Sequence, residues 1–213
     1  MNNKVLYRLS GLALMLAGLS IGIGLGLHHS QVTGETITTF RWSAVHIASG
    51  FGLLLSLFGL FFVFSRQKER LGFWELLSFI FVVISTSMLG GVTLVVEGLL
   101  SPALAGRGML LDEFMVPGQP FFLGFLATLS MFAVGYVIFG IVTFRVSSLC
   151  WFASLLLIVS APTIVLGLTI LPIVVLRIGG AVFGLAFVRL GTVLWSTADS
   201  PTRGFTSERL APA

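Results

Sequence analysis

The stretch GFWELLSFIFVVISTSMLGGVTLVVE, residues 72–97, decides the fold class of this protein. It carries two ionisable side chains, Glu75 near one end and Glu97 at the other, and the residues between them are mostly apolar. A helix needs about 20 apolar residues to cross the ~30 Å hydrocarbon core of a bilayer. Because the apolar residues are continuous rather than alternating, the stretch predicts a membrane-spanning α-helix and not a strand of a membrane β-barrel.

Runs of the same kind fill most of the 213 residues, of which 56% are hydrophobic and 9% charged. A soluble domain carries about 25% charged residues, so the composition excludes a soluble enzyme, a nucleic-acid-binding protein and a disordered chain. We predict an all-α, polytopic membrane protein with a single transmembrane domain, 1–213, built as a six-transmembrane-helix bundle. The helices are expected at about 9–28, 42–65, 72–97, 121–144, 148–169 and 172–195, with an outer loop at 98–120 and a cytoplasmic tail at 196–213.

The distribution of Lys and Arg predicts the orientation, because cytoplasmic loops carry an excess of these residues. With the N-terminus inside, the cytoplasmic side collects nine: Lys4, Arg8, Arg66, Lys68, Arg70, Arg145, Arg189, Arg203 and Arg209. The outer side collects three: Arg41, Arg107 and Arg177. We therefore expect a multi-pass protein of the inner (plasma) membrane with cytoplasmic N- and C-termini.

A short pattern recurs along the chain and suggests an internal repeat. The tripeptides at 58–60, 139–141 and 183–185 all read Phe-Gly followed by Leu or Ile. An arginine follows each tripeptide after a few more residues, at Arg66, Arg145 and Arg189. After Trp74 and after Trp151, a threonine follows twelve residues later. These matches favour a parallel repeat of helical hairpins. The alternative is coincidence, since Phe, Gly and Leu are abundant in this chain.

Glycines at helical spacing predict where helices pack closely. Lipid does not drive apolar faces together, so membrane helices associate where small residues let their backbones approach. The first helix carries the zipper Gly18, Gly22 and Gly26. Further packing glycines are expected at Gly52, Gly59, Gly90, Gly140, Gly167 and Gly184.

The third predicted helix also carries a polar stripe. At 100° per residue, Glu75, Thr86, Gly90, Thr93 and Glu97 share one face. Because ionisable residues inside spans usually face a bundle interior or a watery cavity, the stripe is a candidate proton or cation path. The alternative is that both carboxylates sit at the interfaces and the threonines bond to their own helix.

Other polar residues fall near the outer surface. Arg177 can pair with Glu97, bind an anionic head group or substrate, or extend its guanidinium to the interface. The histidines, among them His46, can ligate haem as an axial pair or hold a metal together with Glu97. No spacing supports either site, so we expect no metal and no cofactor.

The chain resembles a group of uncharacterised bacterial six-helix integral membrane proteins, of the domain-of-unknown-function type. The likeness rests on the basic, Ser-Gly-Leu-rich start at 6–12, on His46 followed by 57–60 and a basic loop at 66–68, and on the outer segment at 97–105. The resemblance implies an inner-membrane location. It implies no established activity and transfers no functional residues.

Three functions stay open from the sequence. Standard catalytic motifs are missing, so the first hypothesis is a non-enzymatic accessory or regulatory subunit that acts through helix–helix contacts with a membrane-protein partner or a second copy. The second is a small transporter or ion-coupled carrier that uses the polar stripe. The third is a haem- or metal-bearing redox membrane subunit. In each case the lipid bilayer is the expected partner, and no nucleic acid is.

Overall fold

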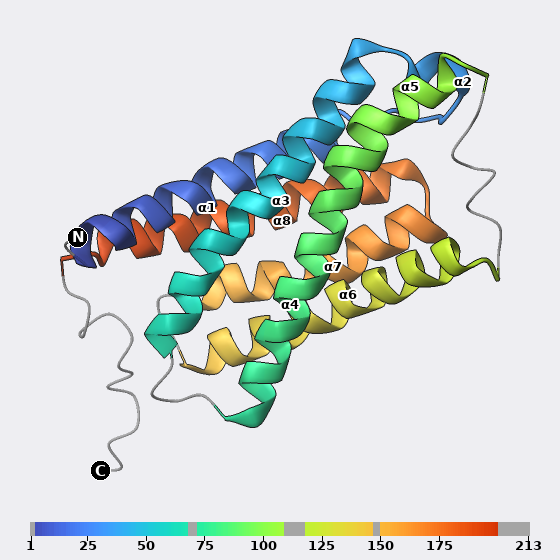
Figure 1. The fold of residues 1–213 in the computed structure, drawn as a ribbon. Helices are drawn as coiled ribbons and strands as arrows, with labels where there is room; N and C mark the ends of the chain where they lie inside the picture. Colours follow the sequence, from blue (N-terminus) through green and yellow to red (C-terminus); the bar gives the residue numbers. More distant parts are fainter. Residues whose placement is uncertain (1–2, 68–71, 109–117, 147–149, 200–213) are drawn as a thin grey trace, which may run out of the picture.

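The computed structural model describes residues 3–67, 72–108, 118–146 and 150–199, and helix is the regular structure in all these ranges (Figure 1). The long helices are α1 (Asn3–Gly26), α3 (Phe40–Gln67), α4 (Phe73–Gly91), α6 (Pro120–Val146), α7 (Trp151–Thr169) and α8 (Ile173–Ser196). Short helices are α2 (Gly34–Ile37) and α5 (Ser101–Ala105). A π-helical segment, Val92–Leu100, joins α4 to α5 without a break.

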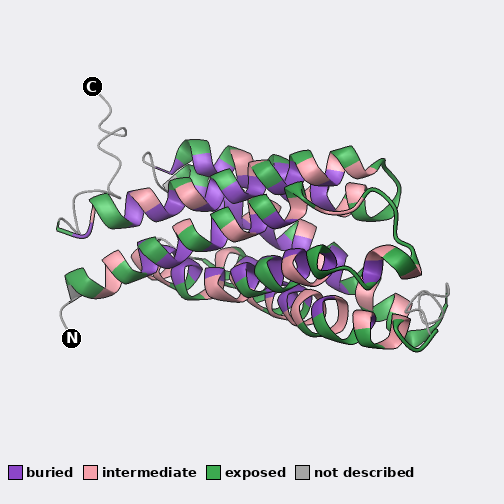
Figure 2. Ribbon diagram, turned by 90° about the horizontal axis from the view of Figure 1, so that it is seen from above, coloured by how far each residue is buried: buried purple, intermediate pink, exposed green. Residues whose placement is uncertain are grey.

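The described residues contain six helices that are long and apolar enough to cross a membrane. Large apolar side chains cover their outer surfaces, including Phe40 at 87% and Phe73 at 70% exposure. A soluble monomer rarely exposes apolar patches of this extent, whereas lipid solvates them. Figure 2 shows the complementary pattern, with buried residues gathered on the faces that the helices turn toward one another. The predicted six-helix, multi-pass membrane fold is confirmed.

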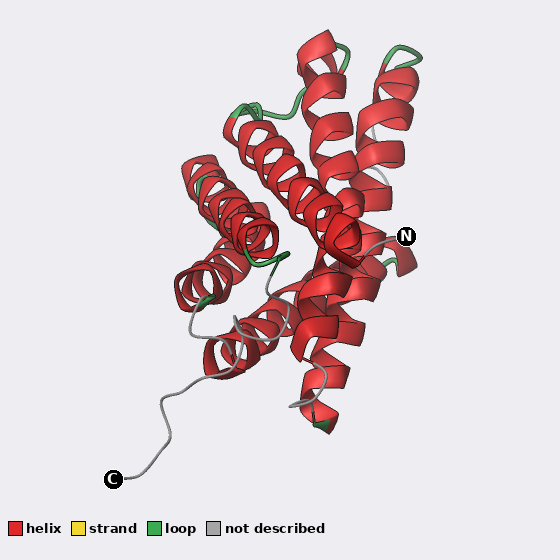
Figure 3. Cartoon of the chain, turned by 90° about the vertical axis from the view of Figure 1, so that its left-hand side faces the viewer, coloured by secondary structure: helices red, strands yellow, loops and turns green. Residues whose placement is uncertain are grey.

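The six long helices form a closed ring. Each packs against two neighbours in the order α1, α3, α4, α6, α7, α8 and back to α1. Figure 3 shows the helices from a second side, some along their axes and others from the side. The first and last helices meet at one end, where Lys4 and Arg8 both pair with Asp199. We call this end the terminus end, and the opposite end the pocket end.

The seam between α1 and α8 depends on glycines of both helices. A Cβ atom on Gly11 would lie 2.6 Å from the carbonyl oxygen of Gly191, and one on Gly18 would overlap the carbonyl oxygen of Gly184. At Gly26, by contrast, a Cβ atom would meet nothing within 4 Å. The predicted zipper is therefore wrong at Gly26, because α1 ends there and has no neighbour at that point.

The remaining glycines contact different neighbours. Gly22 lies near Gly184, Gly52 and Gly59 face α1, Gly90 faces α3, Gly140 faces α7 and Gly167 faces α8. Gly59 and Gly140 occupy matching positions in the proposed repeat. One packs on the helix that precedes its own and the other on the helix that follows. The packing thus does not show the internal repeat, which stays a prediction.

Two helix ends differ from the sequence-based expectation. Helix α1 begins at Asn3 rather than at residue 9. The expected outer loop at 98–120 is helical as far as Ala105, because the apolar run continues and Pro102 falls in the first turn of α5, where a missing N–H is tolerated. Residues 109–117 of that loop, and 200–213 of the expected tail, lie outside the described residues.

Candidate functional site

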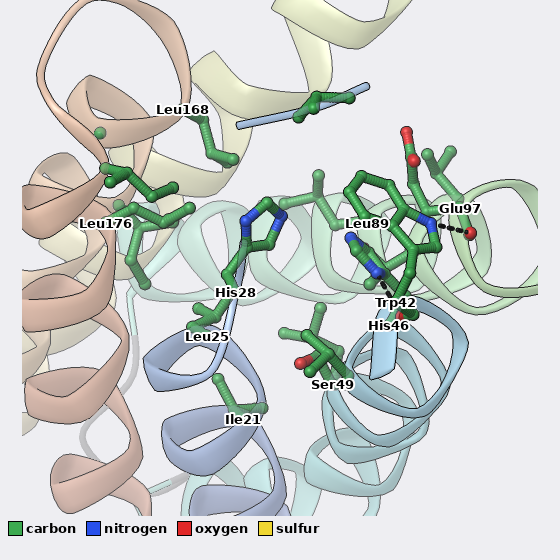
Figure 4. A pocket seen from close by; sticks show the side chains of 18 of the residues that line it. Ile21, Leu25, His28, Trp42, His46, Ser49, Leu89, Glu97, Leu168 and Leu176 are labelled. Atoms are coloured by element: carbon green, nitrogen blue, oxygen red, sulfur yellow. Dashed lines mark hydrogen bonds between the residues drawn. The ribbon is translucent and has the colours of Figure 1, made fainter. Parts of the chain in front are cut away.

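A pocket of about 370 Å³ lies inside the ring toward its pocket end (Figure 4). Residues from α1, α3, the π-helix, α6, α7 and α8 line it. Most of the lining side chains are apolar, among them Ile21, Leu25, Leu53, Leu89, Phe132 and Phe183. Small-molecule sites in proteins have this size and this largely apolar character, with a few polar groups that fix orientation.

Two imidazoles provide much of the polar character of the pocket. His46 of α3 is 6% exposed, and its Nδ1 donates a hydrogen bond to the carbonyl oxygen of Trp42 at 2.8 Å. His28, just after α1, donates from Nδ1 to the carbonyl oxygen of His29 at 2.9 Å. Because a carbonyl oxygen only accepts, both bonds fix the tautomer with Nδ1 protonated. Each neutral imidazole therefore keeps a lone pair on Nε2, for which no described residue supplies a donor.

The two rings and Trp42 form one aromatic cluster. The centroids of His28 and His46 lie 5.1 Å apart at an interplanar angle of 70°, and Trp42 lies over His46 with centroids 4.2 Å apart. Figure 4 shows the two imidazoles turned toward each other in the pocket. The indole Nε1 of Trp42 donates to the backbone carbonyl of Glu97 at 2.8 Å, which ties α3 to the π-helix. Packing and hydrogen bonds thus hold the cluster in place.

Two arginines fix the end of α1 from both sides. Arg41 of α3 donates to the carbonyl oxygen of Leu27 at 2.8 Å, and Arg177 of α8 donates to that of His28 at 2.6 Å and to Ser30 Oγ at 3.1 Å. Cations stabilise the C-terminal end of a helix, where carbonyl groups lack intrahelical partners. These contacts give Arg177 a positioning role for His28.

The same arginines affect the charge state of His28. Burial lowers the pKa of His28 below its ordinary value of 6.5, and the positive charges of Arg177 and Arg41 lower it further. A lowered pKa means that the imidazole is neutral at pH 7. His28 is therefore a hydrogen-bond acceptor at Nε2 and not a cation under physiological conditions.

The π-helix brings a further group of polar side chains to the pocket. Its wider turn is seen in the bond from the Ser101 N–H to the carbonyl oxygen of Val96, five residues earlier. Thr93, Glu97 and Ser101 all border the pocket, and Ser101 Oγ donates to Glu97 Oε2 at 3.4 Å. π-Helical turns are rare and occur often at functional sites. This segment is therefore a second, independent feature that marks the pocket.

The predicted polar stripe divides into three separate environments. Thr86 is fully buried, and its Oγ1 shares a hydrogen bond of 2.9 Å with the hydroxyl of Tyr136 on α6. Glu75 accepts a bond from the Gly72 N–H at 2.8 Å, so it caps its own helix at the terminus end. Thr93 and Glu97 border the pocket. The stripe is therefore not one continuous path in this structure.

Below the pocket, aromatic rings fill the centre of the bundle. Phe183 contacts Tyr136 with ring centroids 4.9 Å apart and Phe187 with centroids 4.6 Å apart. All three side chains are 0% exposed. We call Tyr136, Phe183 and Phe187 the aromatic layer. Phe183 also borders the pocket, so the layer lies directly next to it.

The geometry also bears on the metal and haem hypotheses. Among the described residues, no group of three or more His, Cys, Asp or Glu side chains is arranged to hold a metal ion. His28 and His46 contact each other edge to face, so a porphyrin cannot lie between them as an axial pair requires. The arrangement instead suits hydrogen bonding to a small molecule.

Sequence reasoning missed two members of the site. Ser49 of α3 is 2% exposed, borders the pocket, and its Oγ has no hydrogen-bond partner among the described residues. The second is Trp42, near the start of α3, which is 2% exposed and borders the pocket. The spacing of Trp42, His46 and Ser49, at four and three residues, places all three on one helix face, and this was the available signal.

No protein-family model, no curated protein and no solved structure matches the chain. What is shown is therefore the architecture: a multi-pass membrane protein with six helices able to span a membrane and a pocket among them near one end.

Proposed function

We propose that this protein is a non-enzymatic accessory or regulatory membrane protein that binds a small, largely apolar molecule in the pocket. The observation that carries the proposal is the pocket itself, which lies within the helix ring and is bordered by fixed polar groups. Sites of this kind usually bind the molecule that occupies them through burial of apolar surface, with polar contacts for selectivity. Binding in such a site changes the stability of the ring and so provides a signal.

The structure favours binding over conduction. The aromatic layer closes the centre of the bundle beneath the pocket. A carrier would have to open a route past this layer, and the α1–α8 seam, where backbones touch at Gly11 and Gly191, resists separation. The transporter hypothesis therefore stands second.

The proposal also covers the orientation of the protein in the membrane and the kind of partner that it contacts. The terminus end carries Lys4, Arg8, Arg66, Arg145 and Arg189, which supports a cytoplasmic location for both termini. The pocket then opens toward the outer side of an inner membrane. The apolar helix faces provide contact area for a membrane-protein partner or a second copy, with no role for nucleic acid.

The proposal is tested by asking what copurifies with the protein in lipid nanodiscs. Organic extraction and mass spectrometry should find a small molecule with wild type that is lost in Val45→Phe, because Val45 is 5% exposed and borders the pocket. The matched control is Ala48→Phe, on the same helix but exposed, which should retain it. Equal content in wild type and Val45→Phe would refute the proposal. Saturable flux of the molecule across proteoliposomes would favour the carrier instead.

A further inference from the structure

We propose that the pocket selects a neutral amphiphile whose head group donates hydrogen bonds through a hydroxyl, such as an alkylphenol or a hydroquinone. This inference rests on the proposed binding function and names the class of molecule that the site takes. It comes from whether each polar group around the pocket accepts or donates hydrogen bonds, beginning with His28 and His46.

Hydrogen-bond acceptors face the centre of the pocket. Nδ1 of His28 and Nδ1 of His46 each donate to a backbone carbonyl, which leaves Nε2 of both rings with a lone pair. In Figure 4 the two imidazoles face one another, so one head group can reach both. These two nitrogens keep accessible surface, so a ligand in the pocket can reach them. A hydroxyl carries one proton and so can donate to either of these two atoms, and a ligand that brings such a donor is favoured over one that brings only acceptors.

Three nearby side chains direct hydrogen bonds to backbone carbonyls rather than into the pocket. The indole N–H of Trp42 bonds to the backbone of Glu97, and the guanidinium groups of Arg41 and Arg177 bond to backbone carbonyls at the end of α1. An anionic head group in the pocket would lie beside the two acceptor nitrogens and the carboxylate of Glu97, and neither arginine lines the pocket. Ser49 adds a hydroxyl that both donates and accepts, and it has no partner among the described residues.

A cationic head group is also disfavoured. The charges that act on His28 include those of Arg41 and Arg177 but not that of Glu97, so a cation that bonds to His28 is repelled although Glu97 borders the pocket. A neutral hydroxyl avoids both penalties. The apolar walls, including Leu53, Leu89 and Phe132, then bury the alkyl or aromatic body of the ligand, which contributes most of the affinity.

The test compares matched probes that differ in one donor. We would titrate 4-hexylphenol and its methyl ether, 4-hexylanisole, into nanodiscs that contain the protein with Trp74, Trp151 and Trp195 replaced by Phe. Trp42 is then the remaining tryptophan, and because it is 2% exposed in the pocket wall, its fluorescence reports pocket occupancy rather than partition into lipid. Excitation at the red edge of the tryptophan band avoids absorption by the phenol.

The expected result is that the phenol binds about five- to tenfold more tightly than the ether, which corresponds to one hydrogen bond of about 1 kcal/mol. In the double variant His28→Phe/His46→Phe, which removes both acceptors and keeps aromatic rings beside Trp42, the phenol should bind only as tightly as the ether, while the ether is unchanged. His29→Phe is the matched control, because His29 does not line the pocket, and it should preserve the preference. Circular dichroism of each variant checks that it folds.

Other outcomes separate this inference from the proposed function. Equal binding of phenol and ether, or tighter binding of hexylamine or hexanoate than of the phenol, overturns the hydroxyl selectivity but leaves a binding pocket. Absence of any Trp42 response to all four probes overturns both. The comparison of probes in the wild-type pocket is decisive even if the double variant fails to fold.

Discussion

The α1–α8 seam provides a quantitative test of how the bundle is held together, through Gly11→Ala. A Cβ atom at this position would lie 2.6 Å from the carbonyl oxygen of Gly191 and 3.0 Å from the backbone nitrogen of Trp195. Non-bonded heavy atoms prefer a separation of about 3.5 Å, so the two helices must move apart by roughly 1 Å. The obstructing atoms are backbone atoms, which cannot rotate away.

The expected cost follows from two opposing contributions. Overpacking costs about 1–3 kcal/mol, while Ala gains up to about 1 kcal/mol over Gly in helix propensity. The net loss of unfolding free energy is therefore about 1–2 kcal/mol. In water, burial of apolar side chains would offset part of this loss of unfolding free energy. In lipid, close packing is itself a main source of helix association, so the loss is not recovered.

The assay is reversible unfolding in mixed micelles, with SDS as the denaturant and circular dichroism as the readout. Gly26→Ala is the matched control, because it makes the same change on the same helix where nothing lies within 4 Å; it should leave stability unchanged or slightly raised. Gly191→Ala opposes Gly11 across the seam, so the double variant should cost at least about 0.5 kcal/mol less than the sum of the single variants. Equal effects at Gly11 and Gly26 would refute the packing argument.

Three further predictions concern the aromatic layer and the pocket. Tyr136→Phe leaves Thr86 without its partner and should cost about 0.6 kcal/mol, at most about 1.7, in the same unfolding assay; a Thr86→Val background should reduce that effect to the contribution of the Tyr136–Ser56 hydrogen bond. Arg177→Met frees the end of α1, so affinity for hexylphenol should fall several-fold, whereas Arg107→Met should not change it. Affinity for hexylphenol should not change with pH above about pH 6.5, because the lowered pKa of His28 keeps its imidazole neutral there. It should fall on further acidification, when the imidazole gains a proton and stops accepting. A pH-independent affinity in wild type, or unchanged pH dependence in His28→Phe, would contradict this.

The sequence predicted the spans well because one physical constraint dominates. A chain in hydrocarbon must satisfy its backbone bonds internally, so each apolar run of about 20 residues becomes a helix. Residues 72–97 thus indicated both that this segment lies in lipid and that it is an α-helix. The same reasoning placed a loop at 98–120 too early, since apolar residues continue to Ala105 and the proline is tolerated where it falls.

The pocket could not be predicted in the same way. Its polar groups come from the end of α1, from α3 and from the π-helix, and they meet only because the ring closes in one order. Thr86 and Glu97 were expected on one face. In the structure Thr86 bonds to Tyr136, fifty residues away, and Glu97 lies at the pocket on the far side of a change in helical turn.

Composition and run length therefore determined that the chain lies in lipid, how often it crosses, and that both ends of the described chain share one side. Tertiary structure alone decided which faces meet, and hence where a pocket forms and which imidazole atoms enter it. The physical reason is that lipid solvates every apolar face equally. The choice among faces is then made by backbone approach at Gly11 and Gly191 and by interhelical bonds such as Trp42 to Glu97, neither of which a single helix reveals.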